Sequence, residues 1–131
     1  MNLLLDTHIF LWSLLEPERL SPRLTATLED PQHQIWLSPI TTWECLVLAA
    51  RGRVRLDPDP VTWVRRELGR LGLAEAPLNH EVAIASRTID LDQADPADRF
   101  LAATAAVYDL TLVTADERLL AGRGYSVLGN R

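Results

Sequence analysis

The fold of this chain is decided by a short stretch near its start, which reads Asn2-Leu3-Leu4-Leu5-Asp6-Thr7-His8-Ile9-Phe10-Leu11-Trp12. Residues 2–5 are typical of a short strand that is buried on both faces, and residues 7–15 are typical of a nearly all-apolar helix. A buried strand that leads directly into a helix is the repeating unit of parallel α/β folds. Asp6 stands between the two, at the edge of the sheet where ligands bind in such folds.

The same alternation of strand and helix continues along the chain. Further strands are predicted at 34–38, 73–76, 111–114 and 126–128. Helices are predicted at 22–30, 41–50, 60–71, 80–89, 96–108 and 116–121. We therefore predict a single domain, residues 1–131, with a three-layer α/β/α architecture and a mainly parallel sheet of four or five strands.

The apolar side chains are numerous for a chain of this size. In the helix predicted at 60–71, helical spacing places Val61, Val64, Leu68 and Leu71 on the inward face. The chain also has four tryptophans and many apolar helix faces, more than one small core readily hides. We therefore expect part of this apolar surface to be buried between subunits.

The composition excludes several classes of protein. At 47% hydrophobic and 24% charged residues, the chain is typical of a globular domain. No apolar run approaches the ~20 residues of a membrane span, and the first residues lack the basic region of a signal peptide. The single cysteine, Cys45, cannot form an internal disulfide, which favours a cytoplasmic location. The chain has no Cys/His cluster of the kind that holds structural zinc.

The charge excludes further classes. The net charge is −5, and all thirteen basic residues are arginine. Response-regulator receivers and P-loop nucleotide enzymes both need a lysine that this chain lacks. Haloacid-dehalogenase phosphatases need a second acid two positions after the first, where this chain has His8.

Three further acids follow the pattern of Asp6 at predicted junctions between strands and helices: Glu44, Asp98 and Asp116. Carboxylates gathered at one edge of a sheet repel one another unless a cation neutralises them. Hard divalent ions such as Mg²⁺ or Mn²⁺ prefer oxygen ligands of this kind. The four acids therefore predict a metal site for phosphoryl transfer or nuclease chemistry.

Each acid alone is also compatible with a structural role. Thr41-x-x-Glu44 and Thr114-x-x-Glu117 both fit a capping box, in which a side chain closes the start of a helix. Asp95, followed by a proline, is expected to cap its helix from outside the acidic pocket. Asp98 and Asp116 would then be first-turn acids that the helix dipole favours.

Four ordered motifs carry a resemblance to a known family: Asp6-Thr7-His8-Ile9-Phe10-Leu11-Trp12, Ser38-x-x-Thr41-x-Trp43-Glu44, Asp95-Pro96-Ala97-Asp98-Arg99 and Thr114-Ala115-Asp116. Together they resemble the PIN-domain family, and within it the VapC-type toxins of toxin–antitoxin pairs. The resemblance implies that Asp6, Glu44, Asp98 and Asp116 form the catalytic quartet of an endoribonuclease that depends on Mg²⁺ or Mn²⁺. It also implies RNA as the substrate, a homodimer and inhibition by a small cognate antitoxin.

Within this interpretation, Asp6, Asp98 and Asp116 are the predicted metal ligands. Glu44 binds metal directly or through water, and the sequence leaves both open, as it does the number of ions. Thr7 and Thr114 are predicted to orient a carboxylate or a metal-bound water. The predicted contacts to RNA phosphates are Arg51, Arg53 and Arg99.

Some assignments have alternatives. Arg99 is also placed to pair with a neighbouring acid, and His8 is expected to be a packing residue within its apolar helix. At the level of the whole protein, the alternatives are a non-catalytic PIN-like binding module and a metal-dependent phosphoryl-transfer enzyme of another class.

Overall fold

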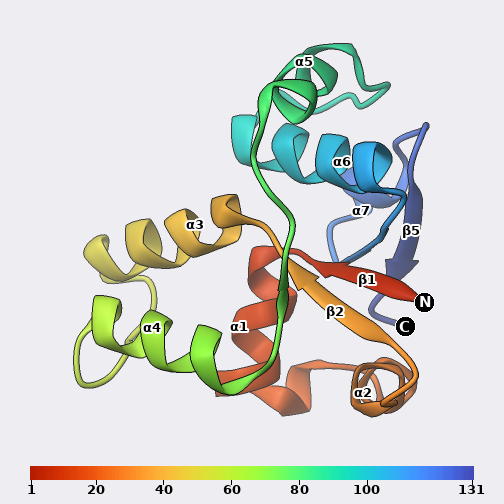
Figure 1. The fold of residues 1–131 in the computed structure, drawn as a ribbon. Helices are drawn as coiled ribbons and strands as arrows, with labels where there is room; N and C mark the ends of the chain where they lie inside the picture. The colour runs from red at the N-terminus through yellow and green to blue at the C-terminus, as the bar shows by residue number, and fades with distance from the viewer.

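The computed structural model describes residues 1–131 and shows the predicted alternation of strands and helices (Figure 1). The strands are β1 (Asn2–Leu5), β2 (Gln34–Leu37), β3 (Ala74–Glu75), β4 (Thr111–Thr114) and β5 (Ser126–Gly129). The helices are α1 (Thr7–Leu15), α2 (Pro22–Glu29), α3 (Pro39–Ala50), α4 (Pro60–Arg70), α5 (His80–Thr88), α6 (Pro96–Tyr108) and α7 (Glu117–Leu120), with a short 3₁₀ turn, η1 (Pro17–Arg19).

The five strands form one parallel sheet in the order β3-β2-β1-β4-β5. β1 lies at the centre, with Leu4 opposite Trp36 of β2 and Leu5 opposite Val113 of β4. The predicted parallel α/β architecture is confirmed. Because the strands are parallel, the chain leaves β1, β2 and β4 at the same edge of the sheet, next to the starts of α1, α3 and α7.

Helices cover both faces of the sheet, as three layers require. Leu3 and Leu5 of β1 enter a core formed with α1, α2, α3 and α4, whereas Leu4 enters a second core with α6 and α7. In Figure 1, α5 and α6 lie together above the strands, and α1 and α4 lie to their left and lower left. None of the helices combines the length and the apolar character that crossing a membrane requires.

The inward face of α4 differs from the prediction. Trp63 and Val64 are buried, but Val61 and Leu68 are 53% and 38% exposed. The buried stripe passes instead through Glu67, whose carboxylate lies 2.5 Å from the guanidinium of Arg70. Val64 is buried and Leu71 packs against the core, as predicted. The prediction was wrong for Val61 and Leu68, because the buried stripe of α4 passes through Trp63 and Glu67 instead.

Candidate active site

The carboxyl edge of the sheet borders a groove of about 420 Å³, which we call the acidic groove. It is lined by Asp6, Thr7, His8, Trp12, Glu44, Asp95, Asp98, Leu101, Ala115, Asp116 and Arg118. These residues come from α1, α3, α6 and α7, from the caps before α1 and α6, and from the connection between β4 and α7. All four acids of the predicted quartet therefore line one groove.

Asp6 is buried and serves two elements at once. One carboxylate oxygen caps α1 by accepting a hydrogen bond of 2.8 Å from the backbone N–H of Ile9. The other oxygen accepts a hydrogen bond from the hydroxyl of Thr114. The Asp6 N–H donates to Val113 O at 3.0 Å, which extends the pairing of β1 with β4 and brings Thr114 alongside. Burial raises the pKa of Asp6, against the opposing effect of the Thr114 hydrogen bond.

Glu44 is half-buried on α3 and is held by a second threonine. Its carboxylate accepts a hydrogen bond from the hydroxyl of Thr7, and this hydroxyl lies 3.5 Å from that of Thr41. Burial raises the pKa of Glu44, and the Thr7 hydrogen bond acts against the rise. The capping box predicted for Thr41 and Glu44 is wrong, because α3 begins earlier and Ser38 caps it through Ile40 N–H at 3.1 Å.

Asp95 is the N-cap of α6 and Asp98 lies in its first turn, three residues later and facing the same side. Asp95 caps the helix as predicted, accepting from the N–H of Ala97 at 2.9 Å. However, it also lines the acidic groove, so the expectation that it lies outside was wrong. The pKa of Asp98 is raised to about 7, first by burial and then by repulsion from Asp95, Asp116, Glu44 and Asp6.

Asp116 caps α7 by accepting from the N–H of Arg118 at 2.9 Å. The capping box predicted for Thr114 and Glu117 is therefore wrong. The Thr114 oxygen instead accepts from the N–H of Asp116 at 3.0 Å, while its hydroxyl hydrogen goes to Asp6. Arg118 lines the groove with its Nε 3.6 Å from the Asp116 carboxylate. Nothing in the sequence singled out this arginine except its place two residues after a predicted ligand.

The donor chemistry of the acidic groove fits a hard divalent cation. Apart from the imidazole of His8, its strong donors are carboxylate and hydroxyl oxygens. The pKa values of Asp6, Glu44 and Asp98 are raised by burial, which a nearby cation would oppose. In their present positions, no three or more His, Cys, Asp or Glu side chains form a group that could hold an ion. Mg²⁺ is commonly held through one or two carboxylates while it keeps several waters. The groove therefore fits a hydrated cation better than a cage made entirely of protein ligands.

His8 is exposed and lines the groove, so its predicted role as a packing residue is wrong. Its ring centroid lies 5.8 Å from that of Trp12, which is one turn later on α1 and also lines the groove. The i, i+4 spacing of the two rings in the sequence was the signal that could have identified them as one surface feature.

The three arginines predicted to contact RNA are in different environments. The guanidinium of Arg99 donates to the backbone carbonyls of Ser86, Ile89, Leu91 and Gln93, at 2.7–3.1 Å. It holds the connection between α5 and α6 and forms no ion pair with an acid, so we remove it from the candidates. Arg51 is exposed just after α3 and lines neither the groove nor the pocket beside it, so we also remove it from the candidates. Arg53 lies in a pocket that adjoins the groove.

Comparison with known proteins agrees with this fold. Residues 3–123 match the PIN domain family. Over 125 residues the chain is 30% identical to Ribonuclease VapC22 of Mycobacterium tuberculosis, covering 93% of this chain and 92% of that protein. Among solved structures, the fold is similar to VapBC2 from Rickettsia felis bound to a promoter DNA fragment, with a TM-score of 0.73, 15% identity and 98% of both chains covered.

It is also similar to FitAcB from Neisseria gonorrhoeae, with a TM-score of 0.64, 23% identity and 96% of both chains covered. The resemblance that the four motifs indicated is therefore confirmed. On its sequence over nearly the whole length and on its fold, this chain belongs to the PIN-domain family.

Proposed function

We propose that this protein is an endoribonuclease, dependent on Mg²⁺ or Mn²⁺, and that it acts in the cytoplasm as the toxin of a toxin–antitoxin pair. The observation that carries the proposal is the gathering of five carboxylates, from segments far apart in the sequence, along one groove at the carboxyl edge of the sheet. The similarity to a protein named Ribonuclease VapC22 supports RNA as the substrate.

In this mechanism Asp6, Asp98 and Asp116 hold the metal, and Glu44 binds it directly or through water. When bound, the ion would supply a water of lowered pKa as nucleophile and positive charge to offset that of the phosphoryl oxygens. The chain itself fixes the inner carboxylates: Asp6 is oriented by the start of α1 and by Thr114, and Glu44 is oriented by Thr7. These contacts keep both side chains in place before RNA arrives.

Arg118 supplies a positive charge inside the acidic groove. Its side chain is 66% exposed, and its 3.6 Å contact with Asp116 is a long, solvent-accessible ion pair of little net strength. Arginine binds phosphate oxygens through a planar, two-pronged set of donors. We therefore assign Arg118 to the phosphate of the bond that is cut.

A cognate antitoxin is the proposed protein partner. The structural relatives include complexes of the VapBC type, which supports such a partner here. An acidic groove is complementary to a basic segment, and an arginine from the antitoxin could take the place of the metal's charge. Inhibition by such a segment is tested by adding purified antitoxin to the cleavage assay. Full activity in a stable complex would contradict it.

A homodimer is the proposed assembly. Trp43 on α3 is 57% exposed, and Val61 and Leu68 are exposed on the neighbouring helix α4. Large apolar side chains at the surface of adjacent elements are typical of subunit contacts. Light scattering is expected to give twice the mass of one chain. A single-chain mass at micromolar concentration would contradict the dimer.

The activity is tested with purified protein and single-stranded RNA. Cleavage is expected with Mg²⁺ or Mn²⁺ and is expected to stop with EDTA. Asp6→Asn is expected to reduce the rate by more than about a hundredfold, because it removes a charged metal ligand. The matched control is Asp109→Asn, since Asp109 is exposed, outside the groove and at a positive φ that asparagine tolerates.

Two outcomes would contradict the proposal. Cleavage that survives both EDTA and Asp6→Asn would mean that the groove is not the source of the activity. RNA binding without any cleavage would instead favour a non-catalytic binding module.

A further inference from the structure

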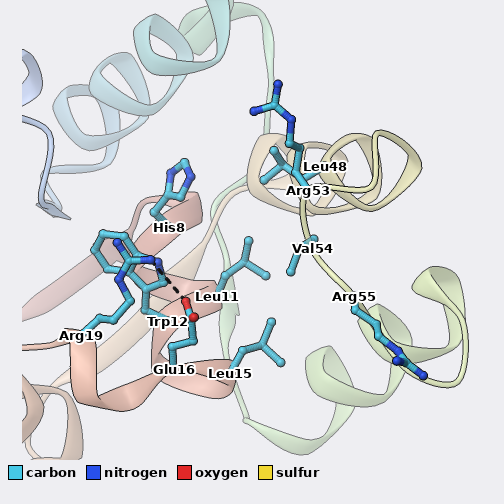
Figure 2. Close-up of a pocket in the computed structure, with 10 residues that line it drawn as sticks. All are labelled: His8, Leu11, Trp12, Leu15, Glu16, Arg19, Leu48, Arg53, Val54 and Arg55. Atoms are coloured by element: carbon cyan, nitrogen blue, oxygen red, sulfur yellow. Dashed lines mark hydrogen bonds and ion pairs between the residues drawn. The ribbon is translucent and has the colours of Figure 1, made fainter.

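A second pocket, of about 540 Å³, adjoins the acidic groove between α1 and the turn that follows α3 (Figure 2). We call it the arginine pocket, and it is lined by His8, Leu11, Trp12, Leu15, Glu16, Arg19, Leu48, Arg53, Val54 and Arg55. His8 and Trp12 line both hollows. A chain bound in the acidic groove can therefore continue into the arginine pocket by passing these two rings.

The sign of the charge reverses between the two hollows. Five carboxylates and one arginine line the acidic groove, whereas three arginines and one glutamate line the arginine pocket. The protein as a whole has a net charge of −5, so a cationic pocket beside the proposed catalytic site is a local exception. Such a patch attracts an anionic chain that the rest of the surface repels.

The three arginines of this pocket differ in the contacts that their side chains already make. Arg19 lies 4.2 Å above the Trp12 ring and contacts Glu16 at 3.4 Å. Arg55 is paired with Asp57 at 3.0 Å. Figure 2 shows both Arg53 and Arg55 extending outward from the apolar lining residues. The side chain of Arg53 makes no hydrogen bond or ion pair. Arg53 is therefore the lining cation most available to a ligand.

The backbone turn that follows α3 determines the position of Arg53. After α3 ends, Gly52 adopts a positive φ of 69° and donates to Ala49 O at 3.0 Å. The next N–H, that of Arg53, donates to Leu48 O at 2.9 Å. This turn is the glycine-dependent helix end that places the following residue back against the last helical turn. It holds Arg53 beside Leu48 at the wall of the pocket.

We infer that the arginine pocket binds the stretch of single-stranded RNA that flanks the cleaved bond, with Arg53 contacting a backbone phosphate. The inference rests on the proposed ribonuclease function. Single-stranded RNA alternates anionic phosphates with flat, apolar base faces. The pocket offers both matching partners, a cation that makes no hydrogen bond or ion pair and a wall of aromatic and apolar side chains that includes Trp12 and Leu48.

The experiment compares Arg53→Ala with Arg51→Ala in the full-length protein. Both substitutions remove one exposed arginine from the same turn, but Arg51 lines neither hollow. The probe is a fluorescently labelled single-stranded RNA of randomised sequence, cleaved at several salt concentrations. Binding without cleavage is followed by anisotropy with the same two substitutions in the Asp6→Asn protein.

Arg53→Ala is expected to raise KM about three- to tenfold with kcat unchanged, because a contact to a flanking phosphate is the same before and during the reaction. The slope of log affinity against log salt is expected to fall by about 0.7, the value for one lost phosphate contact to a single strand. Arg51→Ala is expected to leave KM, kcat and the slope as in the unsubstituted protein.

The possible failures are distinguishable. If RNA is cleaved but the two variants behave alike, the pocket assignment is overturned and the proposed function stands. If the protein neither binds nor cleaves RNA, both are overturned. If Arg53→Ala leaves RNA binding unchanged but weakens binding of the purified antitoxin, the pocket belongs to the protein partner and the RNA assignment is overturned.

Discussion

Asp6 and Glu44, which we call the inner pair, are held in the acidic groove in a different way from Asp98. Asp6 and Glu44 each accept a hydrogen bond from a threonine hydroxyl, which opposes the rise that burial causes in their pKa. Asp98 accepts no side-chain hydrogen bond, and every influence on its pKa, from burial to four neighbouring acids, acts in the same upward direction. The inner pair is positioned by the protein's own contacts, whereas the charge of Asp98 is left uncompensated.

This difference separates two requirements of a metal site. Some ligands must be in place before the ion arrives, and their hydrogen bonds provide that. Others must gain from the ion's arrival, and an uncompensated carboxylate gains most. We expect the inner pair to determine the geometry of the site and Asp98 to contribute most of its response to metal.

The largest expected effect is that of Asp98→Asn. It should reduce RNA cleavage by more than about a hundredfold while raising the melting temperature of the metal-free protein by a few degrees, because it removes a repelled charge. Cleavage assays and thermal melting in EDTA measure the two effects. Asp92→Asn is the control, since Asp92 is exposed nearby in sequence but does not line the groove. If Asp98→Asn lowered both the activity and the melting temperature, the charge of Asp98 would not be uncompensated in the metal-free protein.

Next in size is Thr114→Val, which keeps the shape of a fully buried residue but removes its hydroxyl. Asp6 loses a donor and the Asp116 N–H loses an acceptor, so activity should fall about 10–100-fold and stability by about 1–3 kcal/mol. Thr104→Val is the matched control, because Thr104 is equally buried but bonds only to Phe100 O, at 2.7 Å. Equal activity of the two variants would show that Asp6 does not need this contact.

A smaller effect is expected on the pH dependence of stability. The pKa of Asp98 is raised from 3.8 to about 7, so the folded chain holds this proton more tightly than the unfolded chain. The stabilising contribution is therefore complete below pH 3.8 and is lost as the pH rises through 7. In EDTA, the melting temperature should fall between about pH 4 and pH 7. Asp98→Asn should flatten this part of the profile, and an unchanged slope would remove Asp98 as its cause.

The smallest effect concerns the metal itself. At a Mg²⁺ concentration ten times its dissociation constant, binding to the folded state alone adds about 1.4 kcal/mol of stability. For a domain of this size, that corresponds to a rise in melting temperature of about 4 °C. The rise should be reduced in Asp98→Asn. An equal rise in both proteins would place the ion's main partner elsewhere in the groove.

The sequence was sufficient for the parallel fold and for the edge of the sheet where the acids gather. Three consecutive leucines followed by Asp6 indicate a central strand and its end without any knowledge of packing. The run Thr111–Thr114 indicates the neighbouring strand in the same way. Parallel strands end at the same edge of the sheet. The acids that follow two such strands therefore share one groove if the strands are neighbours, as β1 and β4 are.

Other features depend on packing between distant elements, which no local pattern encodes. Asp95 satisfies every rule for a helix cap, but only the packing of α6 determines that its start faces the groove. Arg99 lies next to a predicted ligand, yet four carbonyls of a loop lie within its reach. At the start of α3, both Ser38-Pro39 and Thr41 satisfy the rules for a helix start, and the folded chain uses the earlier one.

The pairing of β1 with β4 also determines when the groove can exist during translation. β1 is the first strand to be made, and its neighbour β4 is the fourth. Until β4 has emerged from the ribosome, Asp6 lacks Thr114 and the groove lacks Asp116. A nascent chain can fold part of its core early, but contacts between segments so far apart form last. The proposed catalytic groove would therefore be complete only when most of the chain has been synthesised.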